Sequence, residues 1–326
     1  MADAILNRSQ FQTPDKARQH LEAVRWPNGP ICPHCGSLSK NHYALQGKAH
    51  RSGLWKCKDC RKQFSVTVGT VFERSKVPLH QWMQAVYLIC SSKKGCSSHQ
   101  LQRSLGVQYK TAWFMSHRIR EAMKAGGGMF SIGGNTIEAD ETYVGGKQHN
   151  KHARKRLKNA AGGLGKQMVF ALIERETGKA RSFHLPSVNA ANLRPVLNAQ
   201  LNTAKTRLMT DGEGQYRILA PMFASHETVN HSGGEYVRGD AHTNTVESYF
   251  SIFKRGIIGV YHHVSPQHLQ RYATEFDFRY NHRQTRVRIN GKWEKTGFND
   301  AERTDAALKG ISGKRLTYRD SSAVNG

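Results

Sequence analysis

Four cysteines near the start of the sequence have the spacing of a metal site. Cys32 and Cys35 form one Cys-x-x-Cys pair, Cys57 and Cys60 form another, and 21 residues separate the two pairs. Four thiolates suit a tetrahedral Zn²⁺, and a site filled by four protein ligands is structural rather than catalytic. Disulfides are the alternative, but a reducing cytosol disfavours them. The spacing therefore predicts one structural Zn²⁺ bound by all four cysteines.

Three carboxylates later in the chain could bind a harder cation. Asp140 and Asp211 lie near the ends of short apolar runs that predict strands, and Glu247 lies in a stretch with helical periodicity. Mg²⁺ prefers oxygen ligands and retains waters, so a few carboxylates suffice to hold it. Two such ions sharing a phosphodiester would activate a hydroxyl nucleophile and stabilise the leaving oxygen. For Asp211 alone, the sequence Thr-Asp-Gly is also typical of a simple turn.

One predicted helix would present Glu247 together with a lysine. A rotation of about 100° per residue puts an apolar stripe on one face of residues 244–257 and four polar side chains on an adjacent face. These four are Asn244, Glu247, Ser251 and Lys254. Taken alone, a Glu–Lys arrangement of this kind is typical of a solvated helix face. Beside two aspartates at strand ends, it indicates a carboxylate metal ligand followed by a lysine, Lys254, that contacts a phosphate.

Other polar residues near these positions are expected to have no catalytic role. Glu138 and Glu141 flank Asp140 in the predicted strand, and we expect both side chains to point to the face opposite Asp140. His262 and His263 are expected to be packed or solvated rather than in contact with a substrate.

The charge of the chain indicates a polyanionic partner. Lys and Arg number 49 against 24 Asp and Glu, which gives a formal net charge of +25. A chain this basic binds nucleic acid largely through counterion release from the phosphate backbone. A membrane surface is the competing polyanion, but no apolar run approaches the roughly 18 residues of a membrane span. We therefore expect a cytoplasmic protein, nucleoid-associated when acting on DNA, that binds double-stranded DNA and neither a membrane nor a small-molecule substrate.

A pair of predicted helices before residue 124 could contact DNA. Ser97 or Ser98 is a suitable cap, Gly106 a suitable turn, and a second, basic helix begins near Gln108. A short helix, a glycine turn and a longer basic helix are typical of a helix-turn-helix motif. An ordinary helical hairpin is the alternative. The side chains expected to face DNA are those on one side of the second helix, Trp113, His117 and Arg120.

The elements that must position these residues predict an α+β protein of several parts. A glycine-rich stretch, 124–135, links the DNA-binding helices to a large domain with a mixed sheet and flanking helices. The end of the chain has mixed charge and few large apolar side chains, which is typical of partial disorder. The predicted parts are a helical lead (1–24), a zinc ribbon of short strands (25–73), a helix-turn-helix-like segment (76–124), the large domain (132–290) and a basic tail (291–326).

In their order and spacing, these motifs resemble those of bacterial insertion-sequence DDE transposases with an N-terminal zinc ribbon and an ISXO-like transposase domain. The segments that carry the resemblance are CPHCG…CKDCRKQFSVTVGTVF, IEADETYVGGK, LMTDGEGQY, HTNTVESYFSIFKRGIIGVYHHVS and EFDFRYNHR. The resemblance implies an RNase H-like catalytic domain whose triad is Asp140, Asp211 and Glu247. Some relatives use asparagine as the third residue, which keeps Asn244 as an alternative.

The resemblance also implies a function. Such a transposase binds the ends of an insertion element, cleaves at the 3′ ends with Mg²⁺ or Mn²⁺, and transfers those ends into target DNA, acting as a homo-oligomer on the DNA. Two alternatives stay open. One is a zinc-ribbon and helix-turn-helix regulator that binds DNA without catalysis, and the other is a different RNase H-like nuclease.

Overall fold

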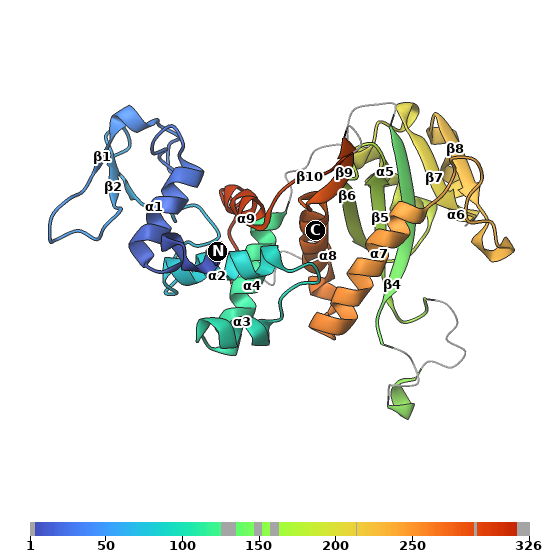
Figure 1. The fold of residues 1–326 in the computed structure, drawn as a ribbon, viewed down its shortest axis with the longest axis horizontal. Coiled ribbons are helices and arrows are strands. Elements are labelled where there is room, and N and C mark those ends of the chain that lie inside the picture. Colours follow the sequence, from blue (N-terminus) through green and yellow to red (C-terminus); the bar gives the residue numbers. More distant parts are fainter. Residues whose placement is uncertain are drawn as a thin grey trace. The chain divides into compact units, whose positions relative to one another are not determined.

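In a computed structural model, the chain divides into two compact units (Figure 1). We call Met1–Lys124 with His282–Gly326 the N-terminal unit, and Ala125–Asn281 the central unit. None of the helices in the described part of the chain is long and apolar enough to span a bilayer. The predicted linker lies almost wholly outside the described residues. The structure describes residues 4–124, 135–146, 152–156, 163–212, 214–289 and 292–317.

The N-terminal unit begins with a helix and a small sheet. Helix α1 (Pro14–Arg25) begins after Thr13, whose side chain accepts a hydrogen bond from the backbone of Lys16 at 3.3 Å. The sheet that follows is antiparallel, with strand order β1-β2-β3, which confirms the predicted arrangement of short strands. The three strands are His42–Ala44, Trp55–Cys57 and Gln63–Phe64.

Three helices follow in the N-terminal unit. Ser97 caps α3 by accepting from the backbone of Gln100 at 3.1 Å, and Gly106 ends that helix in the left-handed region at φ 65°. The short helix, the glycine turn and the longer helix are therefore present as predicted. The three helices are α2 (Leu79–Ser91), α3 (Ser98–Leu105) and α4 (Tyr109–Met123).

The end of the chain returns to the N-terminal unit. Strands β9 (Thr285–Ile289) and β10 (Lys292–Thr296) form an antiparallel pair, and α9 (Asp300–Lys309) contacts α1, α2 and α4. The partial disorder expected after residue 291 is not found in the described residues there, which include β10 and α9. Asn299 and Glu302 form a capping box at the start of α9, and the buried residues of this helix are Arg303, Thr304, Ala307 and Leu308.

A mixed five-stranded sheet forms the centre of the central unit, with strand order β6-β5-β4-β7-β8. Strand β4 pairs antiparallel with β5 and parallel with β7. Strands β5 and β6 form an antiparallel hairpin, with Gly178 at φ 63° in its turn. The bounds are β4 (Thr136–Val144), β5 (Gln167–Glu174), β6 (Ala180–Leu185), β7 (Arg207–Asp211) and β8 (Ser225–Val229).

Helices cover both faces of this sheet, as expected for an α+β domain. The α7 face is covered by α7 (Asn244–Gly256) and α8 (Pro266–Asn281), whose apolar side chains pack on alternate residues of β5. The α5 face is covered by α5 (Ala190–Gln200) and α6 (Gly214–Leu219), which pack on the intervening residues. Figure 1 shows α7 beside β4 and β5, in agreement with the contacts between these elements.

Helix α8 also covers the outer edge of strand β6. Asn281 accepts from the backbone N–H of Ala180 and donates to its carbonyl, at 2.6 and 2.9 Å. Asp277 accepts from the N–H of Ser182 at 2.9 Å, and Gln270 donates to the carbonyl of Ser182, also at 2.9 Å. Polar side chains of a helix thus occupy the backbone groups with which a further strand would pair.

Candidate active site and metal centres

The four cysteines of the N-terminal unit lie around one point. Their sulfur atoms are all within 4.8 Å of one another, with 3.6 Å between those of Cys32 and Cys60 and 3.7 Å between those of Cys35 and Cys57. A tetrahedral Zn²⁺ with Zn–S bonds of about 2.3 Å separates its sulfurs by about 3.8 Å. The donor set and its dimensions therefore fit a structural Zn²⁺.

Asp140 and Asp211 lie on adjacent parallel strands of the central sheet. Strands β4 and β7 pair from Thr136↔Arg207 to Glu138↔Met209, and two further residues in this register bring Asp140 opposite Asp211. The sequence predicts Asp140 near a strand end, whereas it lies in the middle of β4, because β4 continues along β5 beyond its pairing with β7. Asp140 pairs with Ala171, which belongs to the core of the α7 face, so both aspartates lie on that face.

The Asp140 carboxyl group is largely shielded from water and lies near other carboxylates. Burial raises its pKa to about 8, and the nearby carboxylates of Glu141, Asp211 and Glu247 act in the same direction. A hydrogen bond of 2.8 Å from the backbone N–H of Glu141 to Asp140 Oδ1 opposes these effects in part. The acids are therefore close enough to influence one another, and a bound cation would relieve their repulsion.

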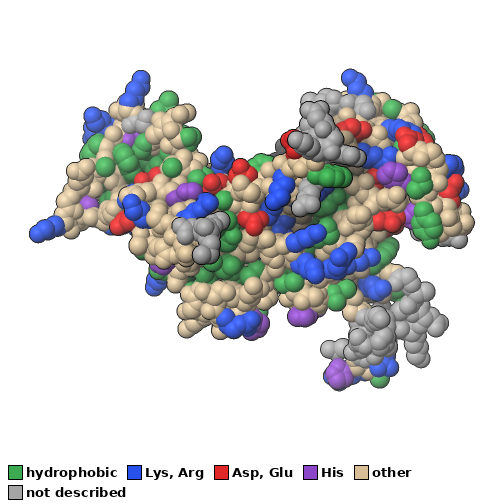
Figure 2. Space-filling view, in the orientation of Figure 1, with side chains coloured by type: hydrophobic (Ala, Val, Ile, Leu, Met, Phe, Trp, Pro, Cys, Tyr) green, Lys and Arg blue, Asp and Glu red, His purple; other side chains and the backbone are tan. Residues whose placement is uncertain are grey.

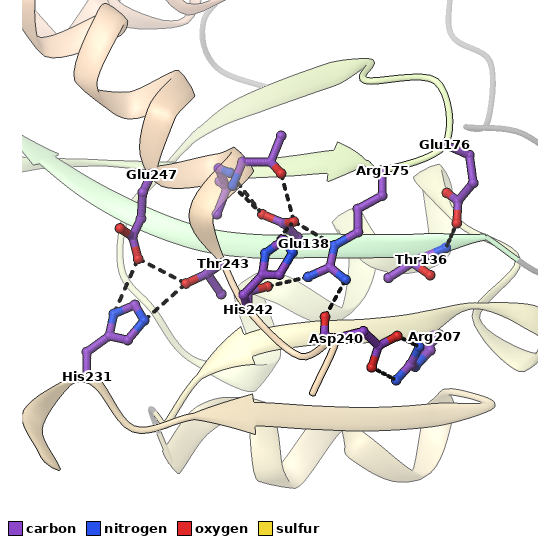
Figure 3. Close-up of polar contacts among 12 residues, drawn as sticks. Thr136, Glu138, Arg175, Glu176, Arg207, His231, Asp240, His242, Thr243 and Glu247 are labelled. Carbon is purple, nitrogen blue, oxygen red and sulfur yellow. Dashed lines mark hydrogen bonds and ion pairs between the residues drawn. The ribbon is translucent and has the colours of Figure 1, made fainter. Parts of the chain in front are cut away.

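Glu247 lies in the first turn of α7 and is held by two side chains (Figure 3). Its Oε1 accepts a hydrogen bond of 3.0 Å from Thr243 Oγ1 and lies 3.3 Å from His231 Nδ1. The Glu247 side chain is 43% exposed, so a ligand can reach it. Asp140, Asp211 and Glu247 are spaced more widely than the cysteines, which form the one group of three or more potential ligands this close among the described residues.

The oxygen-only donor set of these three carboxylates fits Mg²⁺ or Mn²⁺ rather than a softer metal. Asn244 is also exposed in the first turn of α7, and Lys254 is exposed two turns after Glu247. Figure 2 shows a group of Lys and Arg side chains over α7, in keeping with the exposure of Lys254 and Arg255. His262 and His263 are both exposed.

One sequence prediction on β4 is wrong. Glu138 was expected to face away from Asp140, but side chains two residues apart on a strand share a face. Glu138 is fully buried on the α7 face, where it accepts hydrogen bonds from the backbone of Thr245 and Val246. Glu141 does lie on the opposite face, where it accepts a 2.6 Å hydrogen bond from Tyr216 of α6.

The expected DNA-facing side of α4 also needs correction. His117 and Arg120 are 0% and 1% exposed, Trp113 is only partly exposed, and Arg120 donates to Ser116 at 2.9 Å. Buried side chains do not reach a groove of DNA. Within α4 the exposed residues are instead Tyr109 and Lys110, which follow the exposed N-cap Gln108 at the start of the helix.

Sequence reasoning missed Arg175, His231 and Thr243. Arg175 donates to Glu138 at 2.7 Å and His231 lies 3.3 Å from Glu247, both across the fold, whereas Thr243 donates to Glu247 one helix turn further along the chain. The sequence around each of them is that of an ordinary loop or turn. No spacing relates Arg175 or His231 to the acids they touch, so only the tertiary structure reveals them. Thr243 stands four residues before Glu247, and that helical spacing could have indicated the contact.

Comparison with known proteins places these observations in a family. Residues 132–281 match the ISXO2-like transposase domain, and residues 12–63 match the transposase zinc-ribbon domain. The chain is 31% identical over 278 residues to a protein of Halobacterium salinarum described as an uncharacterized protein in transposable element ISH50. That match covers 82% of this chain and 91% of the relative.

Part of the chain also matches a chain in a solved structure, the cryo-electron microscopy structure of the simian T-cell lymphotropic virus intasome in complex with PP2A regulatory subunit B56 gamma. The sequence identity is 12%, and the match covers 56% of this chain and 63% of that chain. With a TM-score of 0.28, the two structures are too different to support a conclusion about this chain. The family is established by the sequence matches instead. With its cysteine cluster and its mixed sheet, the chain belongs to the family of transposable-element proteins that combine a transposase zinc ribbon with an ISXO2-like DDE transposase domain.

Proposed function

We propose that the protein is a DNA transposase that cleaves the 3′ ends of an insertion element and joins them to target DNA with Mg²⁺ or Mn²⁺. The observation that supports the proposal is the convergence of Asp140, Asp211 and Glu247 on the α7 face, where Asp140 senses the charges of the other two. In this proposal the central unit is RNase H-like and supplies the catalytic site. The protein acts in the cytoplasm as a homo-oligomer on paired DNA ends.

The proposed reaction has two steps. In the first, water attacks the phosphorus at the element end, the bond from phosphorus to the 3′ oxygen breaks, and a 3′-hydroxyl and a 5′-phosphate result. In the second, that 3′-hydroxyl attacks a phosphorus of the target, and the target's own 3′ oxygen leaves. Bound divalent ions supply activation of the attacking oxygen and stabilisation of the leaving oxygen.

The residues around the candidate site have different roles in these steps. Asp140, Asp211 and Glu247 hold the ions, and Asp140 must first lose its proton, because its pKa in the metal-free protein is about 8. Thr243 orients the carboxylate of Glu247 through its 3.0 Å hydrogen bond. Lys254, exposed on the same helix, contacts a DNA phosphate.

The test is Mg²⁺-dependent nicking of a duplex that carries the element's end, by the purified full chain. We expect Glu247→Gln, Asp140→Asn and Asp211→Asn each to lower the nicking rate by about three orders of magnitude, while binding of the end changes little. Asn244→Ala is the matched control on the same helix turn, and we expect it to keep most of the activity. An active Glu247→Gln with an inactive Asn244→Ala would make Asn244 the third residue.

The same assay separates the two alternatives. A DNA-binding regulator would bind the end with no nicking by the wild-type protein. A different nuclease would cut without preference for the end and would not join a 3′-hydroxyl to a second duplex.

A further inference from the structure

Helix α7, which carries Glu247, begins without a cap of its own. Its N-cap residue is Thr243, and that side chain makes no capping hydrogen bond. The backbone N–H groups of Thr245 and Val246 donate instead to Glu138 Oε2, at 2.8 and 3.0 Å, and the Thr245 hydroxyl donates to Glu138 Oε1 at 2.9 Å. The cap therefore comes from strand β4, 107 residues earlier in the chain than Thr245.

The borrowed cap leaves Thr243 available for another partner. Its hydroxyl donates to Glu247 Oε1 at 3.0 Å, one turn along the helix (Figure 3). A threonine that capped its own helix would turn its oxygen toward the N–H groups at the helix start. Glu138 thus influences Glu247 in two ways, by holding the first turn of α7 and by freeing Thr243 to hold the Glu247 carboxylate.

Arg175 balances the charge of Glu138 and also bonds the backbone just before α7. Arg175 Nε donates to Glu138 Oε1 at 2.7 Å, and its two terminal nitrogens donate to the carbonyls of Asp240 and His242, at 2.7 and 2.6 Å (Figure 3). His242 Nδ1 lies 3.3 Å from the same Glu138 oxygen. A fully buried carboxylate needs such partners, and this set connects β4 to the residues just before the helix.

The position of Glu138 in β4 relates this cap to Asp140. The two residues are two apart on one strand and on one face of the sheet. A rigid strand that holds Asp140 therefore also holds the start of the helix that presents Glu247. A carboxylate at a helix N-terminus is further favoured by the helix dipole.

We propose that Glu138 and Arg175 are positioning residues that aim Glu247 at Asp140 and Asp211. The inference rests on the proposed function for its chemical meaning, but its structural content is independent of cleavage. Glu138 touches no substrate; it acts through α7.

Amide hydrogen exchange of the metal-free full chain tests the structural content. Glu138→Gln removes the negative charge and leaves one accepting oxygen in place of two, while Thr245, Val246 and Arg175 all donate to this side chain. The remaining amide oxygen is a weaker acceptor, so we expect the N–H groups of Thr245 and Val246 to exchange roughly tenfold faster. Glu174→Gln is the matched control, because Glu174 is also buried, on neighbouring β5, but bonds Asn135 and Thr177 rather than α7. Unchanged exchange in Glu138→Gln, or equal acceleration in Glu174→Gln, would overturn the inference.

Mn²⁺ titration and steady-state nicking test the positioning itself. We expect Glu138→Gln to weaken Mn²⁺ binding and lower kcat by roughly 10- to 100-fold, with KM for the DNA end unchanged. If Glu138→Gln does not fold, Arg175→Lys, which keeps the charge but loses the forked donors, should show the same pattern to a smaller degree. Wild-type levels of Mn²⁺ binding in both variants would refute positioning. A wild-type protein that never nicks would refute the proposed function instead, and hydrogen exchange would still decide the inference.

Discussion

The surroundings of Asp140 change the protonation of its carboxyl group. This carboxyl group lies on the α7 face, and burial, together with the charges of Glu141, Asp211 and Glu247, raises its pKa to about 8. The metal-free protein therefore holds a proton at this position near neutral pH, where an exposed aspartate would have none. A divalent ion must displace that proton, which makes metal binding tighter as the pH rises toward 8.

The raised pKa has a consequence for stability that can be measured. The folded pKa of about 8 lies above the unfolded value of about 3.9, so the folded state binds the proton more tightly. The unfolding free energy of the wild type should therefore fall as the pH rises between these values, by about 2 kcal/mol or more. Asp140→Asn lacks this titration, so it should unfold at a higher temperature than the wild type at pH 8 and lose that advantage toward pH 4.

Calorimetry of the metal-free proteins across this pH range makes the comparison. Glu176→Gln is the control, since Glu176 is exposed and is not among the acids whose charges act on Asp140. Parallel pH profiles for the wild type and Asp140→Asn would mean that Asp140 is ionised throughout the range.

Among the elements, those with local signals could be predicted from the sequence. Ser97 caps α3, Gly106 ends it, and Asp211 ends β7; in each case the deciding residues lie within a few positions of the element. The bond from Glu138 to α7 could not be predicted, because it depends on how two distant segments meet. The buried side of α4 was missed for the same reason: periodicity identifies a second helix face but not what covers it.

The zinc ribbon is the element whose folding should depend on a metal. Cys57 is fully buried at the end of β2, and its sulfur is 3.7 Å from that of Cys35. We expect the wild type to retain one Zn²⁺ per chain, and Cys57→Ser to lose it and to unfold the ribbon, because zinc affinity at such a site is folding free energy. Metal analysis and protease sensitivity of residues 32–60 measure both effects.

Cys96→Ser is the matched control for this experiment. Cys96 is also buried, but it lies outside the cysteine cluster, so its replacement should leave the zinc content unchanged. Less than half an equivalent of zinc in carefully purified wild-type protein would contradict the assignment.

For the molecule as a whole, the excess of positive charge should govern DNA affinity. With a formal net charge of +25, several phosphates are neutralised together on binding. If about six are, the affinity should fall about 10³-fold between 50 and 200 mM salt. Lys254→Ala should lower the slope of log affinity against log salt by about one, because it removes one phosphate contact.

Lys205→Ala is the control for the salt experiment. Lys205 is exposed just before the start of β7, at the opposite end of that strand from Asp211, so its loss should leave the slope unchanged. Fluorescence anisotropy with an end-containing duplex measures these slopes. A binding constant that hardly changes with salt would contradict the electrostatic account.

The cover that α8 gives to β6 has a consequence during synthesis. Asn281 is 101 residues beyond Ala180, whose backbone it bonds. At about 5–20 residues per second, a ribosome needs roughly 5–20 s to make the intervening chain. For that time the outer edge of β6 has unpaired backbone groups, and an unpaired edge invites strands from neighbouring nascent chains. A product that stops before Gln270 never acquires its cover, so truncated copies should aggregate while the full chain stays dispersed.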